Sequence, residues 1–364
     1  MDPLRHVKPA VRALRPYTLA ARCAPVKLNQ NENPFELPES VKRAVVERAL
    51  MRPWSRYPDF DPGELLGALG AFAGWRPDGV LAGNGSNELI QALLLVSAGP
   101  GTRLLLPEPT FTLYALLGAM LGAELVRVPL GPELEYDAGA LRRARRDSGA
   151  GVTIVCSPNN PTGGALAVEE VERLCADGDG LVVVDEAYHE FSGTSVAPLL
   201  QRHENLVVLR TFSKAMALAG LRVGYLLASP ALVREINKAR LPYNLNFLSQ
   251  AAALAALGQR RELEAAVRRL VALREELFQG LAALPGVRPY PSRANFILFE
   301  LLDRDPRAVF EALFERGVLV RDVTSYPRLE RCLRVSVGTP EENAAFLEAL
   351  ALALGECFDA VGGA

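Results

Sequence analysis

Lys214 is the residue of this sequence best suited to covalent chemistry. It follows the apolar segment 206–209 (Leu-Val-Val-Leu), which predicts a buried strand. A lysine amine in a partly dry pocket, or near other cations, has a lowered pKa and becomes a nucleophile toward carbonyl groups, with which it can form a Schiff base. Ser213 before the lysine and Arg222 after it suit an anion, most simply a phosphate. Because a Ser-Lys pair alone is more often part of a solvated loop, support has to come from the rest of the chain.

A reactive lysine beside a phosphate site is the combination that pyridoxal 5'-phosphate (PLP) requires. This cofactor also needs a carboxylate that keeps its pyridinium nitrogen protonated, so that the ring can act as an electron sink. Asp185 ends the apolar segment 181–184, where a buried carboxylate is costly without a cation, and the pyridinium would be that cation. We expect the other contacts from side chains that match one part of the cofactor: Asn160 and Tyr188 for the phenolic oxygen, Ser86, Asn87, Ser213 and Arg222 for the phosphate, and Phe111 for the ring face.

Strand and helix signals alternate through the first two thirds of the chain. The predicted strands are 80–82, 104–106, 124–128, 152–155, 181–184, 206–209 and 223–228, and the predicted helices are 38–50, 89–95, 112–121, 138–146 and 167–176. This alternation predicts an α/β fold with a mostly parallel sheet. Ser86, Asn160, Asp185 and Lys214 each follow a predicted strand, and ligands of open α/β sheets bind at that edge.

Two of these helices have further features. The glycine-rich turn 83–88 opens the helix 89–95, so its backbone N–H groups could hold a phosphate, although such a sequence also forms ordinary turns. The basic helix 138–146 is expected to present a solvated face.

The pattern changes after the long helix expected at 262–284. Strands at 294–299, 318–321 and 332–338, with helices at 306–316 and 341–354, predict a smaller α+β domain. We therefore expect an N-terminal arm (1–40) that packs with the small domain, a large PLP-binding domain (41–270) and the small C-terminal domain (271–364).

The overall composition limits the classes of protein that are possible. The 364 residues carry a net charge of −2, which favours neither nucleic acid nor an anionic membrane. No apolar segment is long enough to span a bilayer, and the N-terminal residues lack the apolar core of a signal peptide. The five scattered cysteines indicate neither a disulfide framework nor a metal site, and they fit a reducing compartment. We expect a soluble cytoplasmic protein without a metal.

Taken together, the motifs resemble those of the fold-type I PLP aminotransferases. They are Asn-Pro-Thr-Gly at 160–163, Asp-Glu-Ala-Tyr at 185–188, Ser213-Lys214 with Arg222, and Leu-Arg-Val-Ser-Val-Gly at 333–338. The resemblance spans nearly the whole chain. It implies a large domain with a mostly parallel seven-stranded sheet flanked by helices, and a smaller α+β domain.

Within this class the chain is similar to the histidinol-phosphate aminotransferases. The similarity lies in segments 28–34, 56–59, 83–88, 242–246, 294–298 and 320–322, although Gln30 stands where relatives often have a small residue. It implies a ping-pong exchange, through a Lys214 Schiff base, between L-histidinol phosphate with 2-oxoglutarate and imidazole-acetol phosphate with L-glutamate. It further implies that Tyr17, Asn31, Arg321 and Arg334 bind the substrate, and that Tyr57 reaches the PLP phosphate of the partner subunit in a homodimer.

Other readings remain open at this point. Aromatic amino acid aminotransferases and threonine-phosphate decarboxylases share most of these motifs. A PLP-binding domain of a transcription regulator is disfavoured because the chain shows no basic helix-turn-helix module. A dinucleotide-binding dehydrogenase is disfavoured because Gly83-Asn84-Gly85 lacks the third glycine and no acidic residue closes a matching second strand.

Overall fold

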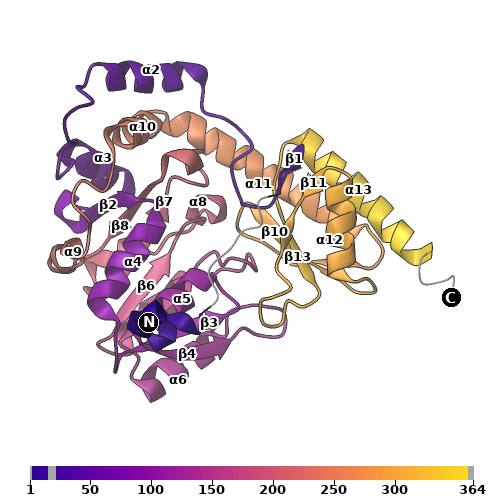
Figure 1. Cartoon of the computed structure of the whole chain (residues 1–364), viewed down its shortest axis with the longest axis horizontal. Coiled ribbons are helices and arrows are strands. Elements are labelled where there is room, and N and C mark those ends of the chain that lie inside the picture. Colours follow the sequence, from indigo (N-terminus) through magenta and orange to yellow (C-terminus); the bar gives the residue numbers. More distant parts are fainter. Residues whose placement is uncertain (1, 15–21, 360–364) are drawn as a thin grey trace.

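The computed structural model describes residues 2–14 and 22–359, and its largest element is a seven-stranded sheet (Figure 1). The strand order is β2-β8-β7-β6-β5-β3-β4. All neighbouring strands are parallel except at β8, which runs antiparallel to both β2 and β7. The strands are β2 (Val80–Asn84), β3 (Arg103–Glu108), β4 (Glu124–Pro129), β5 (Val152–Cys156), β6 (Leu181–Asp185), β7 (Leu206–Thr211) and β8 (Val223–Leu227). The predicted α/β class and mostly parallel sheet are confirmed.

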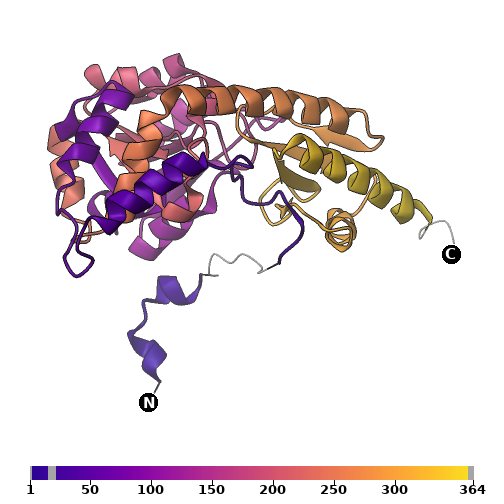
Figure 2. The same cartoon turned by 90° about the horizontal axis from the view of Figure 1, so that it is seen from above.

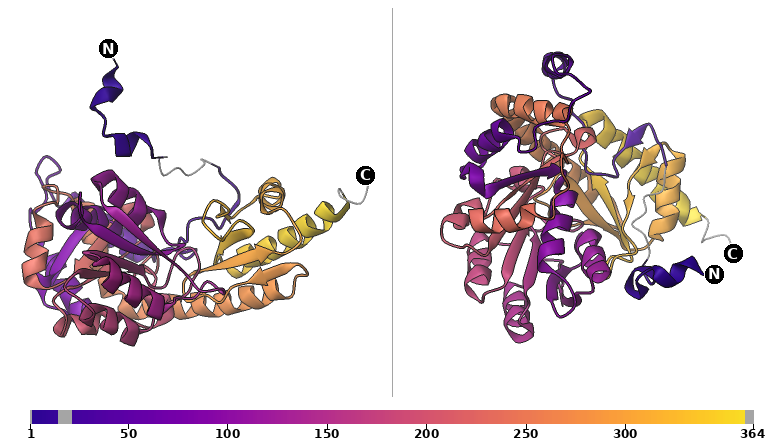
Figure 3. Two further views of the ribbon diagram at one scale, coloured as in Figure 1. Left: turned by 90° about the horizontal axis from the view of Figure 1, so that it is seen from below. Right: turned by 60° about the vertical axis from the view of Figure 1, so that its left-hand side comes forward.

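Helices cover both faces of this sheet, so its central strands are buried on both sides and mostly apolar (Figure 3). In β6, Val182 and Val184 pack into one apolar cluster and Val183 into the cluster on the other face. One face carries α4 (Ser86–Ser97), α5 (Thr112–Leu121) and α9 (Pro230–Asn237), and the other carries α2 (Glu39–Leu50), α3 (Gly63–Ala73), α6 (Ala138–Ser148), α7 (Val168–Ala176) and α10 (Phe247–Gly258). Helices α3, α9 and α10 were not predicted from the sequence.

The C-terminal part forms the expected smaller α+β unit beside the large sheet (Figure 2). Its antiparallel sheet has the order β12-β13-β10-β9. Its elements are β9 (Val287–Pro289), β10 (Phe296–Leu301), α12 (Pro306–Glu315), β12 (Arg321–Asp322), β13 (Cys332–Ser336) and α13 (Pro340–Asp359). The predicted strand 318–321 is in fact two short strands, because β11 (Val318–Leu319) leaves this sheet and pairs in parallel with β1 (Val26–Lys27). Residues 26–27 therefore pair with a strand of the small unit, and the arm (1–40) as a separate part of the chain remains a prediction.

Helix α11 (Arg260–Ala282) connects the two units. Leu263 belongs to the apolar cluster under the large sheet, whereas Leu270 and Leu277 belong to the cluster of the small unit. The domain boundaries at residues 40 and 270 remain predictions. Short helices α1 (Pro9–Arg12) and α8 (His189–Ser192) complete the set of α-helices in the described residues, none of which is long and apolar enough to cross a bilayer.

Helix α6 corrects one prediction about the surface. The side chain of Arg145 is buried, not solvated, and donates hydrogen bonds to Thr153 Oγ1 (2.8 Å) and to the carbonyl oxygen of Gly180 (2.6 Å). The number of charged residues in the helix does not predict this burial. A guanidinium can be buried only where other parts of the chain supply hydrogen-bond acceptors, and these come together only in the folded protein.

Candidate active site

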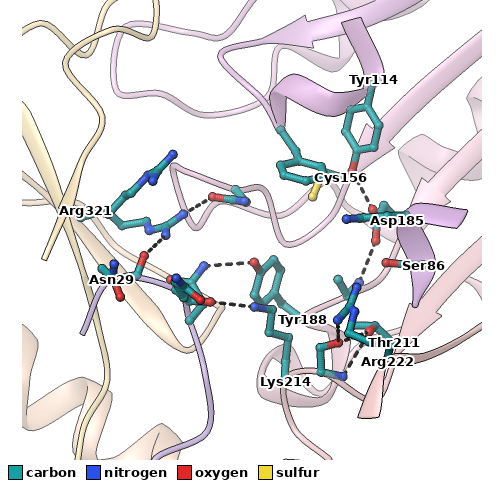
Figure 4. Close-up of a pocket in the computed structure, with 18 of the residues that line it drawn as sticks. Asn29, Ser86, Tyr114, Cys156, Asp185, Tyr188, Thr211, Lys214, Arg222 and Arg321 are labelled. Atoms are coloured by element: carbon teal, nitrogen blue, oxygen red, sulfur yellow. Dashed lines mark hydrogen bonds between the residues drawn. The ribbon is translucent and has the colours of Figure 1, made fainter. Parts of the chain in front are cut away.

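A cavity of about 290 Å³ lies where the carboxyl ends of the large sheet's strands meet the arm and the small unit (Figure 4). Of the predicted site residues within the described ranges, its walls contain all except Tyr57. They are Asn31, Ser86, Asn87, Phe111, Asn160, Asp185, Tyr188, Ser213, Lys214, Arg222, Arg321 and Arg334. Parallel strands deliver their carboxyl ends to one edge, so side chains far apart in the sequence come together there.

Lys214 lines this cavity from the loop after β7, next to Tyr188 (Figure 4). Its neighbours Phe212 and Ala215 are buried and anchor the loop. Nζ donates a 2.8 Å hydrogen bond to the carbonyl oxygen of Gln30. Burial, together with the nearby guanidinium of Arg334, lowers the pKa of Lys214 to about 7. An amine with this pKa is largely unprotonated just above neutral pH, as a nucleophile or general base must be.

Asp185 ends β6 on the opposite wall and is 3 % exposed. Its Oδ2 accepts a 2.6 Å hydrogen bond from the hydroxyl of Tyr114, and its Oδ1 accepts one of 3.1 Å from the backbone N–H of Ala187. Burial raises the pKa of Asp185 to about 6, against the opposing effect of these two donors. The carboxylate thus lies in a dry site where a cationic partner would stabilise it.

Hydroxyl and guanidinium groups gather at the N-terminus of α4. Ser213 Oγ accepts hydrogen bonds from Arg222 Nη1 (3.0 Å) and Thr211 Oγ1 (3.0 Å). A Cβ added at Gly85, whose φ is +78°, would lie 2.5 Å from Arg222 Nη2, and one added at Gly224 would lie 2.3 Å from the backbone nitrogen of Ser86. The two glycines therefore let the guanidinium and the helix N-terminus come close together, which is the arrangement that binds a phosphate.

The arm enters the cavity through Asn31, whose backbone is left-handed (φ +54°). Asn31 Nδ2 donates a 3.0 Å hydrogen bond to the hydroxyl oxygen of Tyr188. Ser336 Oγ accepts from the Asn31 backbone N–H (2.8 Å) and donates to Asn31 Oδ1 (3.1 Å). These bonds fix the amide so that its NH₂ faces the tyrosine. Since the hydroxyl of Tyr188 accepts from Asn31, its own hydrogen is available to a ligand.

Two arginines of the small unit face the same cavity. Arg321 of β12 and Arg334 of β13 are opposite each other in the antiparallel register. Arg334 donates to the carbonyl oxygen of Asn29 (2.9 Å) and to Asn160 Oδ1. Two adjacent guanidinium groups in a cavity suit a phosphate or a carboxylate.

Comparisons with known proteins agree with this geometry. The family Aminotransferase class I and II matches residues 24–350. A histidinol-phosphate aminotransferase of Chlorobium phaeovibrioides is 40% identical over 351 residues, which cover 96% of this chain and 97% of that protein. One of Chlorobium phaeobacteroides is 41% identical over 348 residues, covering 95% and 96%. The crystal structure of histidinol-phosphate aminotransferase from Sinorhizobium meliloti, in complex with pyridoxal-5'-phosphate, has a TM-score of 0.88 at 25% identity, covering 96% of this chain and 98% of that one.

The chain belongs to the class I and II aminotransferases. PLP is the cofactor of this family, and the cavity fits it. The pyridinium nitrogen would supply the cation that buried Asp185 lacks among the described residues. The phosphate would lie against Ser86, Ser213 and Arg222, where the two glycines leave space. Lys214 would then hold the aldehyde carbon between these two ends.

Several residues of the aminotransferase cavity were missed by sequence reasoning. They are Asn29, Gln30, Tyr114, Cys156, Ala187, Thr211 and Tyr326. Gln30 takes part through its backbone carbonyl, which side-chain patterns do not report. For Tyr114, one feature of the sequence could have indicated a place in the cavity. It is a polar side chain on an otherwise apolar helix, three residues after Phe111, the residue proposed to stack on the ring.

The two remaining predicted residues lie outside the cavity or outside the described residues. Tyr57 is 77% exposed and stacks on Tyr243, with 4.4 Å between the ring centroids. Its role toward a partner subunit remains a prediction. Tyr17 is not among the described residues.

Proposed function

We propose that this aminotransferase interconverts L-histidinol phosphate and 2-oxoglutarate with imidazole-acetol phosphate and L-glutamate, the histidinol-phosphate transaminase reaction of histidine biosynthesis (EC 2.6.1.9). Relatives that carry this name are about 40% identical to the chain and align over nearly its full length, which supports the proposal.

The paired arginines are the observation that carries the choice of substrate. In Figure 4, Ser86 and Arg222 lie on one side of Lys214 and Arg321 lies on the other. One anion site would hold the cofactor phosphate, which leaves the second for the substrate. Histidinol phosphate ends in a phosphate and glutamate ends in a carboxylate, and a planar guanidinium matches both groups. We propose that Arg321 and Arg334 bind this end of each substrate, with help from Asn31 and Tyr17.

The side chains of the cavity divide the catalytic work. When bound, PLP supplies the electron sink for the electron pair of the substrate carbon. The Lys214 amine removes the proton from that carbon and returns one in the next step, a task for which a pKa of about 7 is well suited. Asp185 keeps the proton on the ring nitrogen, Asn160 and Tyr188 hold the phenolic oxygen, and Phe111 covers the ring face. The amino group stays on the enzyme between the two half-reactions, which makes the cycle ping-pong.

We further propose that the enzyme is a homodimer. An exposed aromatic surface, formed by Trp54, Tyr57, Phe60 and Tyr243, supports this proposal because such a surface on a water-soluble enzyme is typical of an interface. Within it, Phe60 packs edge-on against Tyr243 with centroids 5.5 Å apart. Tyr57 would extend from this surface to the cofactor phosphate of the second subunit.

Mixed dimers test this arrangement. Lys214→Ala and Tyr57→Phe proteins should each have low activity, because every site would need Lys214 from one subunit and Tyr57 from the other. Unfolding and refolding them together should restore activity through one fully native site in each mixed dimer. A sedimentation velocity experiment that shows a monomer, or the absence of any restored activity, would contradict the proposal.

A cytoplasmic location is part of the same proposal. The four cysteines whose side chains are described (Cys23, Cys156, Cys175 and Cys332) are free thiols, as proteins of a reducing compartment usually have.

The decisive experiment is a colour change. The purified protein, loaded with PLP, should be yellow, and stoichiometric L-histidinol phosphate should bleach it; adding 2-oxoglutarate should restore the colour. Bleaching by phenylalanine or tyrosine but not by histidinol phosphate would instead indicate an aromatic aminotransferase. Release of carbon dioxide from threonine phosphate would indicate a decarboxylase. Lys214→Ala, which removes the amine, should not turn over any of these substrates.

A further inference from the structure

The hydrogen bond between Tyr114 and Asp185 has no counterpart in the catalytic scheme above. Tyr114 lies on α5, is 0 % exposed, and its hydroxyl is 2.6 Å from Asp185 Oδ2. Its ring packs edge-on against Phe111, with centroids 5.5 Å apart. The same side chain therefore contacts both the carboxylate and the aromatic residue proposed to contact the cofactor ring.

The direction of this hydrogen bond is fixed by protonation. Burial and the nearby carboxylate raise the pKa of Tyr114 well above its ordinary value, so its hydroxyl remains protonated and can only donate to an ionised Asp185. A hydrogen bond to the charged form of a carboxyl group favours that form. In a dry site this bond is strong, and it opposes the tendency of burial to neutralise the acid.

We infer that Tyr114 is a positioning residue for the reaction, whose hydroxyl keeps Asp185 ionised and oriented toward the cofactor's pyridinium nitrogen. The inference rests on the proposed pairing of Asp185 with that nitrogen. A neutral Asp185 would not stabilise the pyridinium charge, so without the Tyr114 hydroxyl the cofactor should bind more weakly wherever Asp185 becomes protonated.

Other titratable groups also face Asp185. They are Tyr136 before α6, Cys156 on β5, and Glu186 and Tyr188 after β6, with Lys214 and Arg222 on the cavity wall. Burial raises the pKa values of Tyr136, Cys156 and Tyr188, so these three groups remain neutral between pH 5 and pH 8. Glu186 forms a buried ion pair with Arg210 (2.9 Å).

The test measures cofactor binding rather than turnover. Apoenzyme of the full chain is titrated with pyridoxamine 5'-phosphate, the amine form of the cofactor, which binds without a bond to Lys214. The dissociation constant is measured by calorimetry between about pH 5.5 and 8.5 for the native protein and for Tyr114→Phe. The ratio of the two constants cancels the titrations of the ligand and of all groups that the proteins share.

Tyr136→Phe is the matched control. Tyr136 is also a tyrosine near Asp185 whose hydroxyl donates a hydrogen bond, but its acceptor is the carbonyl oxygen of Cys156. Both substitutions keep the ring, so the loss of packing is small in each. Asp185→Asn is the second reference protein. The amide that this substitution introduces cannot ionise, so the protein shows how tightly the cofactor binds without the Asp185 charge.

For Tyr114→Phe, a rise of about one unit in the pKa of Asp185 is expected from the loss of one such hydrogen bond. The ratio of dissociation constants should then be near one at pH 8.5 and roughly five- to tenfold at pH 5.5, whereas the ratio for Tyr136→Phe should not change with pH. A ratio for Tyr114→Phe that is independent of pH, or an equal rise for Tyr136→Phe, would overturn the inference.

The Asp185→Asn protein separates this inference from the proposed function. Weak binding by Asp185→Asn together with native behaviour of Tyr114→Phe would overturn only the role of Tyr114. If Asp185→Asn binds as tightly as the native protein at every pH, the pairing of Asp185 with the pyridinium is wrong, and both proposals lose their basis.

Discussion

Arg321 and Arg334 lie directly opposite each other on adjacent antiparallel strands, β12 and β13. Like charges at opposite positions of a sheet destabilise it. Arg334 is buried and donates hydrogen bonds to Asn29 and Asn160, so its orientation is already fixed in this structure. Arg321, by contrast, has no hydrogen bond or ion pair to any residue of the described ranges that would compete with an anion. We interpret this pair as a preformed site in which a bound anion relieves the repulsion between the two guanidinium groups.

Arg321→Gln should therefore weaken the binding of histidinol phosphate. A hydrogen bond between charged groups contributes about 1.5–3 kcal/mol, so KM should rise roughly 10- to 100-fold. The change in kcat should be small, because the contact with the substrate phosphate is made in the ground state as well as in the transition state. Steady-state kinetics provide the measurement. Arg307→Gln, an exposed arginine on α12 outside the cavity, is the control and should behave as the native enzyme; an unchanged KM for Arg321→Gln would exclude its proposed role.

Lys214 should be the most reactive lysine of the apoenzyme near neutral pH. Because burial and Arg334 lower its pKa to about 7, the amine loses its proton as the pH rises through 7, and acylation should increase over the same range. Pulse labelling with acetic anhydride, followed by peptide mass spectrometry, measures the extent at each pH. Lys238, whose side chain is 68% exposed, is the reference for a surface lysine.

Replacing Arg334 extends this prediction. Arg334→Leu removes a positive charge that lowers the pKa of Lys214, so the midpoint of labelling should move to higher pH. Equal labelling profiles of Lys214 and Lys238 in the native apoenzyme would show that the cavity does not activate the amine.

Gly85→Ala should damage the cofactor site. Gly85 has φ +78° and ψ 164°, a backbone region that is essentially restricted to glycine and costs other residues about 1–3 kcal/mol. The added Cβ would also lie 2.5 Å from Arg222 Nη2 and would displace the guanidinium from the phosphate position. We expect a lower melting temperature and PLP affinity reduced by at least about tenfold, in line with a loss of 1.4 kcal/mol or more.

The control for this substitution is Gly220→Ala. Gly220 lies near Arg222 in the chain, is exposed, and has open space where a Cβ would be added. Its PLP affinity should therefore equal that of the native protein. If Gly85→Ala also binds PLP normally, measured by equilibrium dialysis, the N-terminus of α4 is not the phosphate site.

The residues at strand ends could be predicted from the sequence because their position follows from the topology. Asp185 and Lys214 both follow continuous apolar segments, and in a mostly parallel sheet the carboxyl ends of such strands meet at one edge. Their common location can therefore be predicted without knowing how the side chains pack. The glycine-rich turn before Ser86 could be recognised for the same reason, because it also follows a predicted strand. The sequence did not predict that this strand, β2, pairs with β8 in antiparallel orientation.

Tyr114 shows what sequence reasoning could not supply. Helix α5 is apolar on nearly every side, so its pattern does not reveal which face packs on the sheet. The acceptor of its hydroxyl lies 71 residues further along the chain. Arg145 was missed for a similar reason, since its partners on other elements exist only after the sheet has formed. Both residues are buried polar groups whose function depends on long-range contacts.

Asn31→Ala should reduce both stability and catalysis. The side chain links three elements, because it donates to Tyr188 and accepts from Ser336 of the small unit. Its loss leaves the buried Tyr188 hydroxyl without a partner, which costs about 1–3 kcal/mol, and removes one of the two hydrogen bonds of the Ser336 hydroxyl, which still accepts from the backbone N–H of residue 31. It also frees Tyr188 from the orientation proposed to serve the cofactor's phenolic oxygen. Thermal unfolding and kcat are measured in parallel with Asn205→Ala. Asn205 donates to the carbonyl oxygens of Cys175 and Gly178, outside the cavity, so its loss should lower stability but leave kcat unchanged. If the two variants lose stability and retain kcat alike, Asn31 only fastens the arm and does not act on Tyr188.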